Sequence, residues 1–444
     1  MNGNIRWPWR LAALTVLGLA STVAQAVPSF ARQTGSECVA CHIGGVGAQL
    51  TAYGIRFKLS GYTDSDGKDG KVPLSARFQI NAYNPNAGDA ITRLDQAAIL
   101  LAGRLTQNVG AMASVERNLD NSTGAITTGL AKTDLKFATE TKLGNRDAII
   151  GASLNNGPGA QDPLGTLPAS GYLVVSYESR AFGQQWAHSM LSGRLANRSV
   201  GLTTFAFLDN SWYGEIGHYG AMSAKTADKL LGQDPVNDPG RMHGFSPYAR
   251  MFYMKDWKTQ FVTAGLVGMQ SRIDSAPGGP ADRLRDVGVD LSYGFVGTRE
   301  HIFKTRAVWL REKRAYGFAP PGALSDATLY ETTFTANYLY RNLVGVMYAR
   351  TSTRSDSDSP FYRFFPNGQP GARFNMIGLY ATPFGKEDSW GAPWANLRVG
   401  IYRLNFKRFN GASADLFGNA YVPAIPNLSA RDIGATWVTA EVSF

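Results

Sequence analysis

Hydrophobic and polar residues alternate with a period of two along most of the chain that follows residue 73. Stretches of about ten residues with this alternation, separated by turns, are typical of tilted strands that cross a bilayer. One face of each such strand suits lipid, and the other suits a wet lumen. The clearest apolar phases are Leu74/Ala76/Phe78/Ile80/Ala82, Ala148/Ile150/Ala152/Leu154, Val287/Val289/Leu291/Tyr293/Phe295, Tyr330/Thr332/Phe334/Ala336/Tyr338 and Leu397/Val399/Ile401. The sequence therefore predicts an all-β fold, a transmembrane outer-membrane β-barrel of about 16–18 antiparallel strands.

The strand count depends on the weaker segments. Counting every alternating stretch, including 171–178 and 186–194, gives about 18 strands, and the weakness of segments such as 186–194 leaves 16 as an alternative. Long connections such as 156–170 fall at one end of the predicted barrel, and short ones such as 209–211 fall at the other. Short periplasmic turns with long external loops are the outer-membrane arrangement, and an even strand count places both termini in the periplasm.

The two ends of the chain agree with export to an outer membrane. Arg6 and Arg10 precede an apolar core at 11–20, and Ala-Gln-Ala at 24–26 offers a cleavage site, so residues 1–26 are predicted to be a signal peptide. No later apolar run approaches the ~20 residues that a spanning helix requires. The last strand, which ends at Phe444, resembles the terminal strand that outer-membrane barrels present to their assembly machinery.

A haem attachment motif lies close to the predicted mature N-terminus. Cys38-Val39-Ala40-Cys41-His42 has the form C-x-x-C-H, in which two thiols add to the haem vinyl groups and the histidine is the proximal iron ligand. It holds both cysteines of the chain. A redox C-x-x-C would expect a surrounding βαβ pattern, and a zinc site would need a fourth ligand. The motif therefore predicts one covalently bound haem c.

The second axial ligand of that haem is not evident from the motif. Between Val27 and Ala111 the chain contains no methionine and no histidine other than His42. The distal position is therefore open, filled by an atypical donor such as the Val27 amine or a lysine, or supplied by the barrel. Met112 is the first candidate in the barrel, because the alternation turns it inward, and a methionine ligand raises the haem potential. The alternative is that Met112 only fills space in the wall.

The remaining N-terminal residues predict a small module that packs on the haem. Leu50, Tyr53, Gly54 and Phe57 share one face of a short helix, which makes Tyr53 and Phe57 candidates for haem packing. A generic amphipathic turn would give the same periodicity. The predicted domains are a monohaem c-type cytochrome module at 27–63, a turn-rich linker at 64–73 and the barrel at 74–444.

Charge and composition restrict the partners. The chain has 44 Lys+Arg against 34 Asp+Glu and only 18% charged residues, which argues against disorder and coiled coils. A net charge of +10 repels free Fe²⁺ and favours anionic chelates, acidic periplasmic cytochromes or anionic lipopolysaccharide. No nucleic-acid-binding motif is present. The other histidines have no spacing partner for a metal site and are His188, His218, His243 and His301.

The order of these segments resembles a known family, the fused outer-membrane monohaem cytochrome-porins, which includes cytochromes implicated in iron(II) oxidation. The matching segments are 28–35 (PSFARQTG), 38–42 (CVACH), 50–51 (LT), 53–54 (YG) and 57–62 (FKLSGY). The resemblance implies haem ligation by His42, thioether bonds to Cys38 and Cys41, and electron transfer across the outer membrane. The barrel resembles the family only in pattern, and the electron donor is not fixed by it.

Three functions compete at this stage. The first is an electron conduit that oxidises extracellular Fe(II), or another external donor, and reduces a periplasmic cytochrome, which would make it an Fe(II):cytochrome c oxidoreductase. The second is a porin-like transport barrel whose haem-bearing plug is structural or regulatory. The third is a haem enzyme such as a peroxidase, for which the sequence near His42 offers no distal histidine. Because the apolar band of a barrel is about 25 Å tall and one haem is shorter, the conduit needs soluble partners. We expect the module to plug the barrel near its periplasmic mouth.

Overall fold

The computed structural model describes residues 28–45, 49–68, 72–86, 89–119, 126–167, 189–192, 199–223, 241–274, 279–297, 299–319, 321, 325–355, 371–383, 396–409 and 434–444. The predicted signal peptide, Val27, the strand expected at 171–178 and His188 lie outside the described residues.

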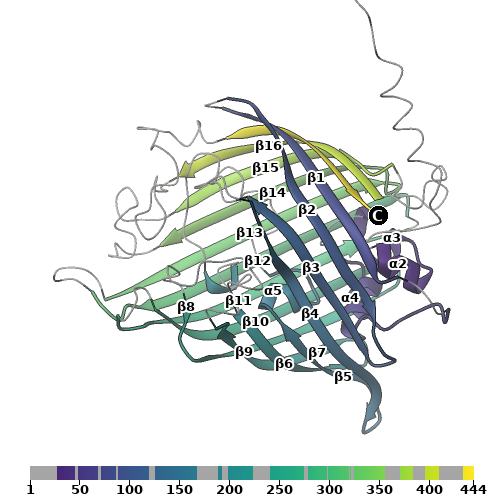
Figure 1. Cartoon of the computed structure of the whole chain (residues 1–444), viewed down its shortest axis with the longest axis horizontal. Coiled ribbons are helices and arrows are strands. Elements are labelled where there is room, and N and C mark those ends of the chain that lie inside the picture. The colour runs from purple at the N-terminus through teal and green to yellow at the C-terminus, as the bar shows by residue number, and fades with distance from the viewer. Residues whose placement is uncertain are drawn as a thin grey trace, which may run out of the picture.

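All the strands in the described residues belong to one closed antiparallel sheet (Figure 1). The first strand, β1, pairs with β2 on one side and with the last strand, β17, on the other, which closes the barrel. The short strand β8 and the longer β9 pair with successive parts of β10 and occupy one position, so the barrel has 16 strands. The strands are β1 (Leu74–Pro85), β2 (Ile91–Arg104), β3 (Val109–Leu119), β4 (Ile126–Leu143), β5 (Arg146–Asn155), β6 (Ser199–Leu208), β7 (Trp212–Ala221), β8 (Arg241–Met242), β9 (Phe245–Asp256), β10 (Gln260–Asp274), β11 (Asp282–Phe295), β12 (His301–Ala315), β13 (Asp326–Tyr340), β14 (Val344–Ser355), β15 (Ala372–Ala381), β16 (Asn396–Phe409) and β17 (Ala435–Ser443).

The structure confirms a barrel of 16 strands, the lower end of the predicted range, and the count of 18 strands is wrong. β5 pairs directly with β6, from Asn155 opposite Gly201 to Ala148 opposite Leu208, so no strand from 156–198 lies between them in the sheet. Within the segment 186–194, Met190–Ser192 form a short 3₁₀ turn, η2, and not a strand. Met190 and Leu191 are buried in an apolar cluster with inward residues of the wall. The prediction failed because apolar residues packed inside a lumen look like a lipid-facing phase.

The two faces of the wall have opposite character, as the alternation predicts. Along β9 burial alternates residue by residue, and on β6 and β7 the outward Leu202 and Ile216 are 61% and 66% exposed while the inward Thr203 and Glu215 are buried. The predicted phases behave in the same way: the outward Leu74, Ile80, Val287, Leu291, Phe334, Ile401 and Val438 are all exposed. An apolar outer face with a polar inner face is stable only where lipid surrounds the wall.

The connections divide the barrel into two ends. The turns after β6 and β13 are tight, with positive φ at Asp209–Asn210 and at Arg341–Asn342, the geometry that two-residue hairpins favour. Leu74, which begins β1, and the chain end at Phe444 lie at this same end, which we call the short-turn mouth (Figure 1). The long connections lie at the opposite end. In the described part of the chain, no helix has the length and apolar character needed to span a membrane.

Short helices lie at the short-turn mouth and inside the lumen. The N-terminal ones are α2 (Pro28–Thr34), α3 (Cys38–Cys41), the 3₁₀ turn η1 (Ile43–Gly45) and α4 (Ala52–Leu59). Figure 1 shows α2, α3 and α4 grouped beside the short-turn ends of the strands. We call residues 28–66 the plug. The other short helix, α5 (Pro158–Gln161), belongs with η2 to the connection between β5 and β6.

Candidate haem site in the barrel plug

The C-x-x-C-H motif forms one turn of helix followed by extended chain. Cys38 and Cys41 begin and end α3. Residues three apart in a helix lie on the same face, so the two sulfur atoms can reach one porphyrin edge. His42 leaves the helix with extended backbone angles and pairs with Leu50 in an isolated β-bridge. This arrangement fixes the histidine next to the thiols.

Helix α4 packs directly on the motif because of a glycine. A Cβ added at Gly54 would lie 2.3 Å from the carbonyl oxygen of Cys41. The N-cap residue Thr51 accepts a hydrogen bond from Gly54 N (3.1 Å), and its hydroxyl donates one to the Ala40 carbonyl (2.5 Å). Gly54 therefore permits the close approach of the two helices, a role that the sequence pattern did not reveal.

Replacing Gly54 with Ala should displace the haem motif. The added methyl group meets backbone and cannot be accommodated by a rotamer change, so we expect a loss of about 1–3 kcal/mol in the stability of the plug and a lower yield of covalently bound haem. Haem staining of the purified protein measures the yield. Gly214→Ala is the matched control, because an added Cβ at Gly214 contacts nothing within 4 Å. Equal haem yields in the two variants would contradict the packing role.

The predicted packing residues occupy two different surroundings. Phe57 is buried, with its ring centroid 5.0 Å from that of Phe30 and 6.0 Å from that of Tyr62. Tyr53 instead donates a hydrogen bond to the Asp64 carboxylate (2.5 Å), and burial together with Asp64 raises the pKa of Tyr53. Leu50 precedes α4, so its place on the predicted helix face is wrong. Contact of Tyr53 and Phe57 with haem stays a prediction.

The residues of this site fit a c-type haem. Burial, with a further contribution from Asp64, raises the pKa of Cys41 to about 12, whereas redox C-x-x-C motifs depend on a lowered thiol pKa. Cys41 and His42 are only partly buried, and the aromatic rings of Phe30, Phe57 and Tyr62 lie within the same small module. Cys38, Cys41 and His42 would hold the haem.

Contacts with many strands fix the plug in the short-turn mouth. The plug spans this mouth of the barrel, because its hydrogen bonds reach strands around the whole wall. They are Ser29 N to Ser75 Oγ (2.9 Å), Arg104 N to Gln33 Oε1 (2.6 Å), Tyr62 Oη to Asp134 (2.6 Å), Arg56 to Asp256 (2.9 Å), Lys304 Nζ to the Leu50 carbonyl (2.6 Å), Gly44 N to Asn342 Oδ1 (3.1 Å) and Asn396 Nδ2 to the Gly45 carbonyl.

The inner side of α4 faces a second obstruction of the lumen. Ala52, Ile55 and Leu59 pack with inward aromatic residues of β6, β7, β9 and β10, and with Leu164 of the β5–β6 connection. Lys58 Nζ donates hydrogen bonds to the carbonyls of Ala160 (2.7 Å) and Asp162 (2.9 Å). The plug therefore rests on the described part of that connection, residues 156–167 and 189–192, which we call the inner segment.

The plug contact made by Lys58 should be sensitive to pH. Burial lowers the pKa of Lys58 from 10.5 to about 8, so the folded state binds this proton more weakly than the unfolded chain does. Stability should therefore rise with pH between about 8 and 10.5, by on the order of 1–2 kcal/mol relative to Lys58→Met. Urea unfolding of both proteins across this pH range measures the difference. Parallel pH profiles would contradict the assignment.

Charged residues of the wall hold the inner segment inside the lumen. Backbone N–H groups of Ser189, Met190 and Leu191 donate to carboxylates on β13, β12 and β11 at 2.8, 2.8 and 2.9 Å. Arg250 of β9 contacts Asp162 of the inner segment (3.2 Å) and Asp290 of β11 (3.0 Å). The sequence pattern predicts 156–170 as an external connection. That prediction is wrong for the described residues, 156–167, which lie inside the barrel. The acidic residues at inward positions of three successive strands, β11, β12 and β13, could have indicated that a segment binds inside the lumen.

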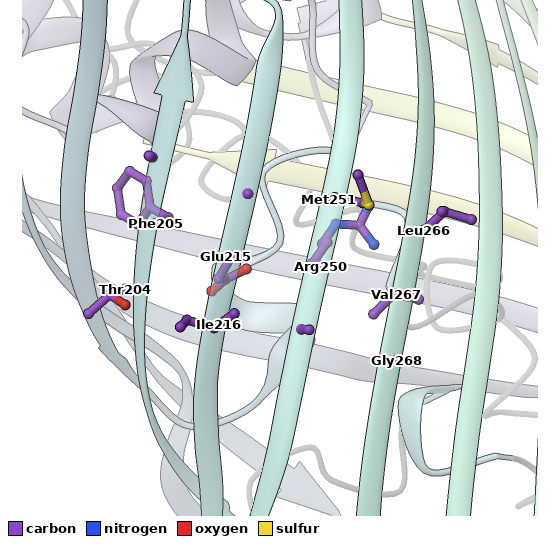
Figure 2. Close-up of a pocket in the computed structure, with 12 residues that line it drawn as sticks. Thr204, Phe205, Glu215, Ile216, Arg250, Met251, Leu266, Val267 and Gly268 are labelled. Atoms are coloured by element: carbon purple, nitrogen blue, oxygen red, sulfur yellow. The ribbon is translucent and has the colours of Figure 1, made fainter. Parts of the chain in front are cut away.

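Figure 2 shows part of this wall, with a pocket of about 660 Å³ that is lined by residues of β6, β7, β9 and β10. Glu215 and Arg250 are register partners on β7 and β9 and belong to the buried inner face. Ile216 and Met251 alternate with them on the exposed outer face. The lining residues of this pocket all belong to the four strands, and none of them belongs to the plug. The pocket is therefore separate from the haem motif.

The candidate distal ligand Met112 lies on the inner face of the barrel wall. Met112 lies in β3 opposite Ala102 and Asp134, and because Asp134 is buried and bonded to Tyr62 of the plug, Met112 shares the inner face. Its role as distal ligand stays a prediction.

His218 is exposed on the outer face, His243 is exposed between β8 and β9, and His301 Nδ1 lies 2.8 Å from Tyr338 Oη. Among the described residues, no group of three His, Cys, Asp or Glu side chains could hold a metal ion.

Comparisons with known proteins identify similar barrels. No protein-family model and no curated protein sequence matches the chain. Among solved structures, the chain is similar to OmpF of Salmonella typhi in complex with daunomycin (11% identity, TM-score 0.47, 84% of this chain and 98% of that chain). It is also similar to an anion-selective porin from Comamonas acidovorans (13%, 0.44, 83% and 98%) and to OmpT of Vibrio cholerae (8%, 0.44, 84% and 98%). At these identities the similarity concerns the fold alone.

Proposed function

We propose that this protein is an outer-membrane c-type cytochrome that carries electrons across the outer membrane. It would take an electron from extracellular Fe(II), or another external donor, and pass it to a periplasmic c-type cytochrome. The observation that carries the proposal is the C-x-x-C-H motif at 38–42 inside a plug that is bonded to the barrel wall. A bound haem supplies a one-electron Fe(III)/Fe(II) couple.

The residues of the chain would have three tasks in this function. Cys38 and Cys41 anchor the group, and His42 ligates its iron. Gly54 and Thr51 hold the motif against α4, and the plug contacts keep that unit at the short-turn mouth. With the outer-membrane arrangement of short periplasmic turns, this mouth faces the periplasm, where a soluble cytochrome can approach. The wall insulates the plug from lipid.

The contents of the lumen argue against free solute transport. The plug occupies the short-turn mouth, and the inner segment lies beyond it, held by ion pairs and hydrogen bonds to β9, β11, β12 and β13. A solute would have to displace both in order to pass. The second candidate, a porin-like transport barrel with a structural plug, is favoured only by the barrel architecture itself.

A redox titration of the purified haem-loaded protein, followed by stopped-flow mixing with Fe(II), tests the proposal. We expect rapid haem reduction by Fe(II), oxidation by a periplasmic cytochrome, and loss of both in His42→Ala. Planar-bilayer recordings of the same preparation should show a conductance well below that of an open porin. A haem that neither Fe(II) nor a periplasmic cytochrome can reduce or oxidise, in a barrel that conducts freely, would overturn the conduit in favour of transport.

A further inference from the structure

The outer wall carries a belt of basic side chains at the end that bears the long connections. We call these residues the basic girdle. Those on β10, β11 and β12 are Arg272, Arg283, Arg285, Arg311 and Lys313, and those on β14, β15 and β16 are Arg354, Arg373, Lys407 and Arg408. On β13 the ring of Tyr330 lies opposite Arg311 in register and 5.1 Å from the guanidinium of Arg354.

The girdle lies at the border of the apolar band. Arg311 and Lys313 are ten and twelve residues beyond His301, the first residue of β12, and Arg354 is ten residues beyond Val344. A tilted strand needs about 9–11 residues to cross the hydrocarbon, so these side chains reach the level of the lipid headgroups. Below them, on the same strands, the exposed outward residues are large and apolar, such as Val289, Leu379 and Ile401.

Cations of the girdle face one another directly across neighbouring strands. Arg272 is opposite Arg283, Arg285 is opposite Lys313, and Arg373 is opposite Arg408. The charges of Arg373 and Arg354 also act on Arg408. Like charges directly opposite each other in a sheet are destabilising. An anion that lay between the strands would relieve this repulsion.

The wall itself does not provide that anion within the described part of the chain. The acidic residues of β11, β12 and β13 face the opposite way and are buried in the lumen, with Asp326 at the start of β13 as the exposed exception; the buried ones are Asp282, Asp286, Asp290, Glu312 and Glu331. Among the described residues, no girdle side chain forms an ion pair with a carboxylate. At this height the acidic side chains of β11 and β12 point inward, where Glu312 pairs with the inward Arg314, and the girdle side chains point outward.

We infer that the basic girdle binds the phosphate groups of a phosphorylated glycolipid of the lipid A type in the outer leaflet. Guanidinium groups bind phosphate oxygens in a bidentate manner, and clusters of basic residues beside an apolar band are typical of anionic headgroup binding. Cations spread over adjacent strands match a headgroup with more than one phosphate, and the apolar band below matches its acyl chains. The inference rests on the proposed outer-membrane location and not on electron transfer.

Binding of diphosphoryl lipid A by the purified full-length protein, measured by native mass spectrometry in neutral detergent, tests the inference. We expect the variant Arg354→Gln/Arg373→Gln/Arg408→Gln to bind at least tenfold more weakly. The matched control, Lys142→Gln/Arg146→Gln/Lys258→Gln, removes exposed basic residues from the short-turn mouth and should bind as the natural protein does. Equal binding by both variants overturns the inference. So does undiminished binding of dephosphorylated lipid A, or displacement of the lipid by millimolar inorganic phosphate, which would indicate a site for a free anion.

A single variant keeps the test informative if the triple variant does not fold. Arg373→Gln removes one member of a like-charge pair, so in neutral detergent its thermal stability should equal or exceed that of the natural protein. In bilayers that contain lipid A the same variant should be less stable, because a phosphate contact is lost. A change in thermal stability of the same sign in detergent and in lipid A bilayers would overturn the inference. Haem absorbance should be unchanged throughout, which separates this result from a failure of the proposed function.

Discussion

Replacing both motif cysteines, Cys38→Ser with Cys41→Ser, should abolish covalent haem while the barrel still folds. Without thiols no thioether bond to the haem vinyl groups can form, so the haem stain of the denatured protein should fall to background. The wall should tolerate the change, because the hydrogen bonds that Ser29, Gln33 and Tyr62 form with β1, β2 and β4 do not involve the cysteines. Gel mobility with and without heating reports whether the barrel has folded.

Val39→Ala is the matched control for the cysteine variants. It alters one of the two residues between the cysteines and retains Cys38, Cys41 and His42, so it should keep its haem stain. Retention of covalent haem in the double cysteine variant would exclude the thioether assignment. His42→Ala should differ from both, because the haem stays attached while its absorbance spectrum and potential change with the loss of the proximal ligand.

The sequence predicted the wall well because lipid imposes one rule on every second position. Val287, Val289 and Leu291 face outward as expected, and the inward direction expected for Met112 agrees with its register opposite the buried Asp134. The inner segment obeys a different rule. Met190 and Leu191 are apolar because they pack inside the lumen, and no local periodicity distinguishes that surrounding from lipid.

The position of the plug could be anticipated, but its contacts could not. A small module next to a wide barrel is expected to lie at the mouth that holds the chain end. The hydrogen bond from Gly44 N to Asn342 joins residues 298 positions apart, and it depends on the register of strands that the sequence does not fix. The role of Gly54 was hidden for the same reason, since its close contact is to the backbone of another element.

The charge distribution connects the lumen with the outer surface. Carboxylates on β11, β12 and β13 turn inward, where they bind Arg250 and the backbone of the inner segment. Girdle residues of β11 and β12, such as Arg285 and Arg311, turn outward. The two faces of these strands therefore differ in charge, and inward carboxylates coexist with a net charge of +10 for the chain.

Arg250→Met should be among the most destabilising single changes in the barrel. Arg250 is fully buried between the carboxylates of Asp162 and Asp290, and its removal leaves both without their shared cation in the lumen. Leaving a buried charge without its partner typically costs about 3–5 kcal/mol. Urea unfolding of the protein in lipid vesicles measures the loss. The inner segment should also detach from β9, so the variant should show higher bilayer conductance than the natural protein.

Two further variants separate this mechanism from a general loss of packing. Arg104→Met removes an exposed arginine at the end of β2 and should change stability by less than about 0.5 kcal/mol. Adding Asp290→Asn to Arg250→Met removes one of the uncompensated charges, so the double variant should recover part of the loss even though it carries a second substitution. If the double variant is less stable than Arg250→Met alone, or if Arg250→Met itself unfolds like Arg104→Met, the inner segment does not depend on this ion pair.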